Sequence, residues 1–193
     1  FLQSGKYRIE KVLGQGSFGI TYLGTLMPSH GSAPDTMEAT AKVAIKEFFM
    51  SEINTRKEDG TTVEGSSSSV FTNYRKKFRR EAENLSKLDH GNIVKVFDVF
   101  DENGTTYYTM EYVGGENLDE YIHRNKPLPE DEIWQIVSRV CDALIFMHDK
   151  LILHLDLKPK NIMRSSVGQI YLIDFGLSKQ FTADGEPEST TTI

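Results

Sequence analysis

The sequence predicts an α+β fold with two lobes, of which the first is built mainly from strands and the second mainly from helices. Runs of β-branched and aromatic residues separated by glycine-rich turns fill residues 7–49. The hydrophobic period then becomes helical over residues 74–90, and the longest helical pattern follows over residues 129–150. Strands and helices in separate runs are typical of α+β proteins. We expect the join near Val113, with one domain over 1–113 and a second over 114–193.

The first part of the chain is expected to form an antiparallel meander. Three strands are predicted over residues 7–16, 20–26 and 42–49, with a loop rich in Pro, Ser, Gly and Asp at 27–40. Residues 51–72 include "GSSSS" and are expected to be irregular and mobile. A helix is predicted next, because Phe78, Ala82, Leu85 and Leu88 recur at helical spacing.

Two more strands and two more helices complete the prediction. The strands cover residues 92–100 and 105–113, and a short helix covers 117–124. The best helical pattern lies over 129–150, where acidic residues suit the first turn. One apolar stripe is expected to be its buried face, formed by Ile133, Ile136, Val137, Val140, Leu144 and Met147. The only cysteine, Cys141, lies in the same segment and is expected to be a small core residue.

Composition limits the classes of function. The 193 residues are 38% hydrophobic and 26% charged, as in ordinary soluble domains, and the net charge of −6 favours neither a nucleic-acid nor an anionic membrane partner. The basic residues within 75–80 are interpreted as a solvated helix face. No apolar run approaches the roughly 20 residues of a membrane helix, and no signal peptide is visible. A single cysteine fits a reducing compartment, so we expect a cytoplasmic protein. The chain begins with Phe1, and we expect both ends to be cut from a longer protein.

Three glycines in "GQGSFG" have the spacing of a phosphate-binding loop. Without a Cβ, Gly14, Gly16 and Gly19 let backbone N–H groups approach phosphate oxygens. A simple glycine-rich hairpin turn explains the same residues equally well. A dinucleotide-binding turn would need a helix after the third glycine, whereas "ITYLGT" is strand-like. We therefore predict a turn between two strands.

Lys46 ends the apolar run "VAIK" and is a candidate for contacting phosphate. It could equally be the polar face of an edge strand. If it is functional, a carboxylate is expected to hold it in place. Glu81 on the following helix is preferred over Glu83, because Glu81 better shares the apolar face of that helix.

The segment "HLDLKPKN" (154–161) followed by "DFG" (174–176) carries the densest polar chemistry of the chain. Asp156 can accept a proton from an alcohol, and Lys158 can neutralise a transferring phosphoryl group. Asn161 and Asp174 offer oxygen atoms to Mg²⁺, which needs only one or two protein carboxylates when phosphates are also present. A single Asp after a strand is most simply a turn cap, but the combination favours phosphoryl transfer.

These motifs, in this order, resemble the eukaryotic-type serine/threonine protein kinase domain over essentially the whole chain. The resemblance implies a two-lobed kinase-like fold with an antiparallel-sheet first lobe, one key helix and an incomplete helical second lobe. It also implies ATP and Mg²⁺ as cofactors and a protein Ser or Thr hydroxyl as acceptor. "DLKPKN" is similar to the serine/threonine-specific loop, and "GSFGITYLG" resembles bacterial members.

Carried onto this sequence, the resemblance implies a role for each motif residue. Asp156 would be the catalytic base and Lys158 its helper, with Asn161 and Asp174 as metal ligands. ATP would contact the glycine loop and the Lys46–Glu81 pair. Its adenine would contact the backbone of the hinge, at Glu111 and Val113, and the surrounding apolar side chains. The implied ATP-binding set is Val12, Leu13, Gly14, Gly16, Gly19, Ala44, Lys46, Glu81, Met110, Glu111, Val113 and Met163. Glu116 and Asp119 are alternative ribose contacts.

The sequence departs from the family pattern at a few positions. Leu155 replaces an Arg that would pair with a phosphorylated activation loop. Lys160 replaces a Glu, which should disfavour basic residues in the substrate peptide. The chain ends at Ile193 within the expected activation loop, so we expect an N-terminal fragment of a kinase. The alternative is a truncated or pseudokinase-like nucleotide-binding scaffold that works through partners.

Overall fold

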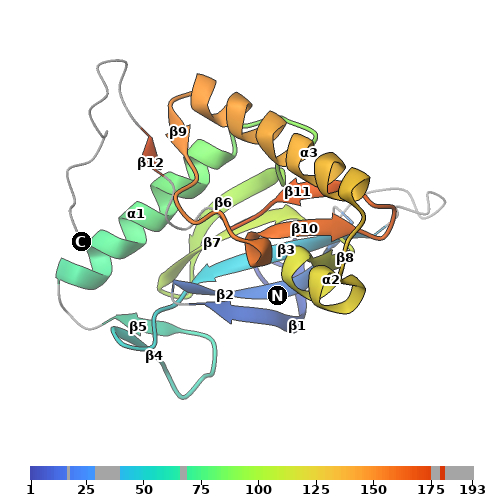
Figure 1. Ribbon diagram of the computed structural model, residues 1–193. Helices are drawn as coiled ribbons and strands as arrows, with labels where there is room; N and C mark the ends of the chain where they lie inside the picture. Colours follow the sequence, from blue (N-terminus) through green and yellow to red (C-terminus); the bar gives the residue numbers. More distant parts are fainter. Residues whose placement is uncertain (17, 29–39, 66–68, 175–178, 181–193) are drawn as a thin grey trace. The chain divides into compact units, whose positions relative to one another are not determined.

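The computed structural model describes residues 1–16, 18–28, 40–65, 69–174 and 179–180, the last two by backbone alone. The chain divides into two units. Figure 1 shows the helices and strands from which they are built. The first unit comprises Phe1–Ser86 and Val96–Tyr112, and the second comprises Lys87–Lys95 and Val113–Ile193. The segment Lys87–Lys95 therefore packs with the second unit although it precedes two strands of the first.

A five-stranded antiparallel sheet forms the centre of the first unit. Its strand order is β1-β2-β3-β7-β6, with bounds β1 Tyr7–Gly16, β2 Gly19–Leu26, β3 Ala41–Phe48, β6 Val96–Glu102 and β7 Thr105–Glu111. All its pairings are antiparallel, so the predicted meander at the start of the chain is confirmed. In the β6–β7 hairpin, β7 pairs with β3 and β6 is the edge strand of the sheet.

The two faces of this sheet bury different groups. On one face, Val43 and Ile45 of β3 pack in a core with Tyr7, Phe100 and Tyr107. We call this the outer face. On the opposite face, Phe48 of β3 contacts helix α1, which spans Ser69–Leu85. Because side chains alternate along a strand, Lys46 shares the α1 face with Phe48.

The region predicted to be irregular contains regular structure, so that prediction was wrong. Residues Asn54–Arg56 form β4, Val63–Gly65 form β5, and the two pair as an antiparallel hairpin. Helix α1 begins at Ser69, earlier than the pattern suggested, and ends at Leu85. Leu88 was predicted to continue this helix, but it lies beyond Leu85 and within the second unit. Strands of three residues are too short to show a periodic pattern, which explains why β4 and β5 were not predicted.

The second unit combines small sheets with two longer helices. Strands β8 (Gly115–Asn117), β10 (Ile162–Ser165) and β11 (Ile170–Leu172) form one sheet, and β9 (Ile152–Leu153) pairs with β12 (Lys179–Gln180). Helix α2 spans Leu118–Asn125, helix α3 spans Glu130–Asp149, and Pro159–Asn161 form a 3₁₀ turn, η1. Helix α3 packs against β9 and β11.

Helix α3 buries only part of its predicted apolar stripe. Val140 and Met147 are buried together with Ala143, whereas Ile133 and Val137 are 44% and 42% exposed. Cys141 is exposed, so its predicted place in the core was wrong. Cys141 lies one position along the helix from Val140, which turns it to a different face. No helix in the described part of the chain is both long and apolar enough to cross a membrane.

Candidate catalytic loop and nucleotide-binding residues

The turn between β9 and β10 brings the two predicted catalytic residues and one predicted metal ligand into direct contact. Lys158 Nζ donates to Asp156 Oδ2 at 2.8 Å and to Asp156 Oδ1 at 3.1 Å. Asn161 Nδ2 donates to Asp156 Oδ2 and to the main-chain oxygen of Asp156, both at 2.8 Å. One carboxylate thus accepts hydrogen bonds from a cation and from an amide.

The position of Asn161 fixes the direction of its amide. Its side chain is 4% exposed, and the backbone N–H of Asn161 donates to the oxygen of Lys158 at 2.9 Å in η1. Because Nδ2 is directed at Asp156, the amide oxygen faces away from Asp156. An outward amide oxygen beside a carboxylate is a suitable donor set for a hard cation.

Asp174 is held close to the same turn by backbone contacts. The N–H of Ile173, the residue before it, donates to the main-chain oxygen of Asn161 at 2.9 Å. Asp174 itself has φ of 57°, in the left-handed region where non-glycine residues are uncommon. Such a conformation persists where the surrounding structure imposes it. The two predicted metal ligands therefore come from adjoining backbone segments of the second unit.

His154 connects these segments, and the sequence analysis assigned it no role. It is 2% exposed, its Nε2 lies 3.3 Å from the oxygen of Ile173, and its Nδ1 accepts from the N–H of Asp156 at 3.3 Å. Burial lowers the pKa of His154, and this outweighs the charges of Asp174 and Asp156, which raise it. The neutral ring then donates from Nε2 to Ile173. The signal that could have found it is a His flanked by the apolar run Leu151–Leu153 and by Leu155.

Leu155 adopts a left-handed conformation beside the candidate base. Its φ is 59° and its side chain is 51% exposed, so the residue is held by its backbone rather than by packing. Leu has no group that can pair with a phosphate. The candidate base therefore has no cationic neighbour at the preceding position.

The glycine residues lie on the first two strands of the first unit. Gly14 and Gly16 end β1, Gly19 begins β2, and Gly16 pairs with Gly19. A strand follows the turn, as predicted. A Cβ at Gly14 or Gly16 would meet no atom within 4 Å, whereas one at Gly19 would lie 2.4 Å from the oxygen of Glu47. Packing therefore requires glycine only at Gly19, and the clearance at Gly14 and Gly16 has room for a bound group.

Lys46 and Glu81 lie on surfaces that face each other. Lys46 is 7% exposed and lies on the α1 face of β3. Glu81 precedes the buried Ala82 on α1, one turn after Phe78, which contacts Phe48 with ring centroids 5.5 Å apart. A buried lysine needs a compensating partner. This arrangement is compatible with the predicted pairing of the two residues, which stays a prediction.

The other predicted nucleotide contacts divide between the two units. Ala44 of β3 pairs with Met110 of β7, and both side chains are buried. Val12 and Leu13 of β1 are 57% and 42% exposed, so they are accessible apolar surface. Glu111 ends β7 in the first unit, and the second unit contains Val113 and Met163, the latter opposite Asn117.

The two alternative ribose contacts differ in their partners. Glu116 pairs with Arg124 at 2.5 Å, whereas the Asp119 carboxylate lies 4.0 Å from His123 Nδ1. Glu116 and Asp119 stay alternative predicted contacts of the ribose.

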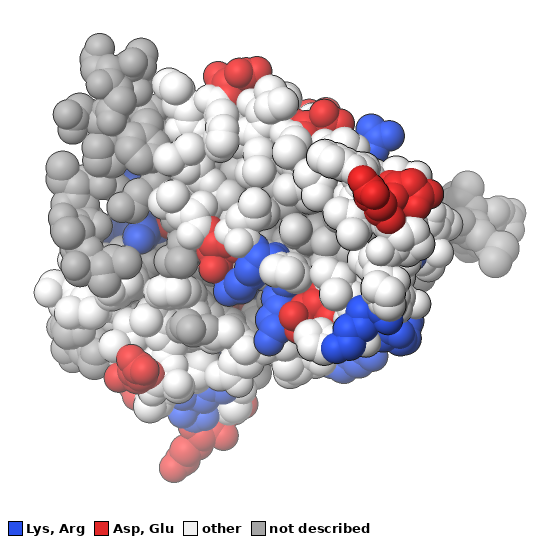
Figure 2. All heavy atoms as spheres, in the orientation of Figure 1, with Lys and Arg blue, Asp and Glu red and all other residues white. Residues whose placement is uncertain are grey.

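The basic residues of helix α1 lie beside acidic side chains. Figure 2 shows basic and acidic side chains next to one another on the face drawn. Within the basic cluster of α1, Arg79 pairs with Glu83 at 2.8 Å and with Asp101 at 3.1 Å. Arg75 donates to the oxygen of Gly104 at 3.1 Å. Lys76 and Arg80 are exposed and Arg79 is partly exposed, which agrees with the interpretation of a solvated helix face.

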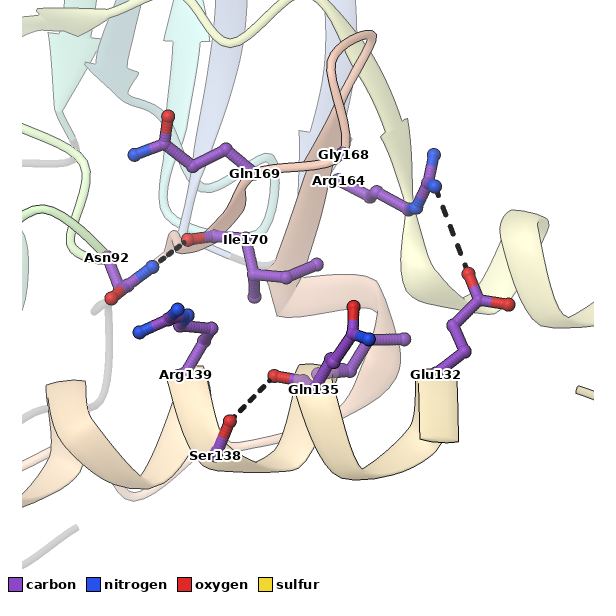
Figure 3. A pocket seen from close by; sticks show the side chains of 10 residues that line it. Asn92, Glu132, Gln135, Ser138, Arg139, Arg164, Gly168, Gln169 and Ile170 are labelled. Atoms are coloured by element: carbon purple, nitrogen blue, oxygen red, sulfur yellow. Dashed lines mark hydrogen bonds and ion pairs between the residues drawn. The ribbon is translucent and has the colours of Figure 1, made fainter. Parts of the chain in front are cut away.

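A separate hollow of about 300 Å³ lies in the second unit between α3 and the β10–β11 hairpin. Figure 3 shows Arg164 directed toward Glu132 and Asn92 bonded to the oxygen of Ile170. None of the predicted catalytic or nucleotide-contacting residues lines it. The hollow is therefore distinct from the candidate catalytic loop.

Comparison with known proteins agrees with this arrangement. The protein kinase domain matches residues 7–193. The serine/threonine-protein kinase PrkC of Bacillus subtilis is 34% identical over 175 residues, which is 91% of this chain and 23% of PrkC. The probable kinase MARK-C of Dictyostelium discoideum is 34% identical over 177 residues, 90% of this chain and 19% of that protein. The probable kinase YbdM of Bacillus subtilis is 30% identical over 180 residues, 93% of this chain and 60% of YbdM.

The chain thus spans between about a fifth and three fifths of the length of these relatives. The match to the kinase domain nevertheless begins at Tyr7, the first residue of β1, and runs through the glycine turn, Lys46, the candidate catalytic loop and Asp174. The predicted two-lobed kinase-like fold, with an antiparallel-sheet first lobe and an incomplete helical second lobe, is confirmed by this match. The chain belongs to the protein kinase domain family.

Proposed function

We propose that this chain supplies the nucleotide-binding and phosphoryl-transfer residues of a serine/threonine protein kinase. The substrate would be a protein Ser or Thr hydroxyl, and the donor would be the γ-phosphate of ATP. The observation that carries the proposal is the contact of Asp156 with both Lys158 and Asn161 in one turn. Relatives named as serine/threonine-protein kinases support the substrate class.

Asp156 is proposed as the group that accepts the proton of the substrate hydroxyl. Its carboxylate is held by Lys158 and Asn161 and can therefore be aimed without reorganisation. Lys158 can turn from Asp156 to the transferring phosphate, because its ammonium is a point charge on a flexible stem. In this role it offsets the negative charge that develops during transfer.

Asn161 and Asp174 are proposed to hold Mg²⁺, and the residues fit that ion. The Asn161 amide oxygen faces away from Asp156, and the backbone before Asp174 is bonded to Asn161. An amide oxygen and a carboxylate are hard oxygen donors, and phosphates and water complete the shell. When bound, Mg²⁺ neutralises charge on the phosphate oxygens.

The residues of the first unit are proposed to hold ATP. The clearance above Gly14 and Gly16 suits phosphate groups bound by the backbone, and the ammonium of Lys46 would contact them. Ala44, Met110 and Met163 would contact the adenine, as would Val12 and Leu13. The backbone of Glu111 and Val113 would bond the edge of the base. We also propose a cytoplasmic protein, since its single cysteine is free.

The test replaces one residue of each group in the full-length protein. Asp174→Asn and Lys46→Met should each abolish transfer of the γ-phosphate to a generic protein acceptor while leaving the fold intact. The control is Lys57→Gln, which removes an exposed lysine of the β4–β5 hairpin and should leave the rate unchanged. Transfer at the unsubstituted rate in either active-site variant would refute the assignment. ATP binding without transfer in the unsubstituted protein would favour the scaffold alternative.

A further inference from the structure

The β4–β5 hairpin between β3 and α1 is a folded element with its own turn. Arg56 of β4 pairs with Val63 of β5. Asp59 Oδ1 accepts from the N–H groups of Thr61 and Thr62, both at 2.8 Å, which satisfies the donors of the turn. Asp59 therefore fixes the turn of the hairpin. The hairpin also contacts the five-stranded sheet and helix α1.

One end of the hairpin is anchored in a buried carboxylate of β3. Glu47 is 1% exposed on the outer face of the sheet. Arg56 meets it with both terminal nitrogens, Nη1 at 3.1 Å and Nη2 in an ion pair. Tyr22 and Tyr107 donate their hydroxyl groups to it, each at 2.7 Å. A fully buried carboxylate is destabilising unless it is paired in this way.

The guanidinium of Arg56 is itself fixed from several sides. Nη2 donates to the Tyr22 hydroxyl at 2.9 Å and Nη1 to the oxygen of Thr61 at 3.1 Å. The group also lies 5.0 Å from the ring centroid of Phe49. Burial has the largest influence on the pKa of Arg56 and lowers it, but the contacts with Glu47 and the tyrosines raise the pKa overall. The guanidinium of Arg56 is thus held by hydrogen bonds to three residues.

The other end of the hairpin contacts the β6–β7 turn and α1. The N–H of Val63 donates to the oxygen of Asn103 at 2.8 Å. A Cβ at Gly104 would lie 2.4 Å from the oxygen of Val63, and a Cβ at Gly65 would lie 2.3 Å from the ring of Phe71. Phe71 is buried on α1. At these contacts the hairpin packs so closely that only glycine fits.

The hairpin therefore connects the two elements that carry Lys46 and Glu81. Glu47 follows Lys46 on β3, so anchoring Glu47 on the outer face fixes the backbone from which Lys46 extends on the opposite face. We propose that Arg56 is a positioning residue that, through Glu47, holds Lys46 in place for the phosphates of ATP. This inference rests on the proposed function of Lys46.

The test compares the affinity of the chain for ATP with its affinity for adenosine, which lacks phosphates, by calorimetry. Arg56→Gln should weaken ATP binding about tenfold, the loss of one well-placed charged contact. Adenosine binding should change less than about twofold, since Lys46 does not contact the base. Arg56→Lys should be intermediate, because lysine keeps the charge but not the two-pronged contact. Lys57→Gln, which removes an exposed pair with Glu64 in the same hairpin, should change neither affinity.

The outcomes separate this inference from the proposed function. If Lys46→Met weakens ATP binding and Arg56→Gln does not, the positioning role is wrong. The same holds if Arg56→Gln weakens ATP and adenosine equally, since that is loss of structure. If Lys46→Met leaves the ATP affinity unchanged, the role proposed for Lys46 itself fails. Should Arg56→Gln not fold, the neutral pair Glu47→Gln with Arg56→Gln replaces it, and an unchanged ratio of ATP to adenosine affinity there overturns the inference.

Discussion

Asn161 donates two hydrogen bonds from one amide nitrogen to Asp156, one to the main-chain oxygen and one to Oδ2, both at 2.8 Å. This contact ties the end of η1 to the candidate base. It also turns the Asn161 amide oxygen away from Asp156. One side chain thus has two roles, to hold the carboxylate and to present an oxygen to a cation.

Asn161→Asp should destabilise the protein at neutral pH. The new carboxylate would replace a donor by an acceptor in a site that is 4% exposed, and it would face the carboxylate of Asp156. The expected loss in the free energy of unfolding is about 1–3 kcal/mol. Denaturant unfolding measures it. Asn125→Asp is the control, because Asn125 also donates from Nδ2, to the oxygen of Tyr121 at 2.8 Å, but is exposed. Equal losses in the two variants would contradict the role of the Asp156 contact.

The lowered pKa of His154 should make stability depend on pH in a defined direction. The unfolded chain takes up a proton near the ordinary His pKa of about 6.5, whereas the native ring stays neutral to a lower pH. At pH values between the native pKa and about 6.5, the native state therefore binds fewer protons than the unfolded chain. Stability is full above about pH 6.5 and falls as the pH drops through the window, by up to about 1.4 kcal/mol per pH unit.

Denaturant unfolding at pH 7.5 and 5.5 checks the His154 prediction. His154→Gln should be less stable at pH 7.5 but should lose less further stability at pH 5.5 than the unsubstituted protein. The comparison variant is His123→Gln, which removes an exposed imidazole from α2. If the stability of His154→Gln falls between pH 7.5 and 5.5 as much as that of the unsubstituted protein, groups other than His154 cause the fall.

Leu155→Asn should stabilise the protein slightly. Leu155 has φ of 59°, a conformation that is about 1 kcal/mol less unfavourable for Asn than for a residue with a larger apolar side chain. Little packing is lost, because the Leu155 side chain is 51% exposed. The melting temperature should therefore rise by a few degrees. Leu157→Asn is the matched control at 46% exposure in the same loop, and it should give no gain.

Shortening a side chain to alanine should affect stability differently on the buried and the exposed face of α3. Met147 is fully buried, so Met147→Ala should cost about 2–5 kcal/mol in the free energy of unfolding. Ile145 is 59% exposed on the same helix, so Ile145→Ala should change stability by less than about 1 kcal/mol. Equilibrium unfolding in urea measures both. A large loss at Ile145 would mean that this face of the helix is covered in solution.

The sequence by itself determined the first three strands, the long helix and the residues of the candidate catalytic loop. Strand and helix periods are local properties, and α3 and the β1–β2–β3 meander follow from them. The cluster of Asp156, Lys158 and Asn161 was also predictable, because these residues lie within one short turn. Residues this close in sequence are brought together by the local backbone conformation alone.

Only the tertiary structure decided the contacts between distant segments. The burial of His154 against Ile173, the exposure of Cys141, and the pairing of Glu47 with Arg56 and Tyr107 depend on which surfaces meet. The β4–β5 hairpin was predicted to be irregular because strands of three residues carry almost no periodic signal. Its stability comes from a buried charge pair and close glycine contacts, and these exist only once β3, β6–β7 and α1 have packed around it.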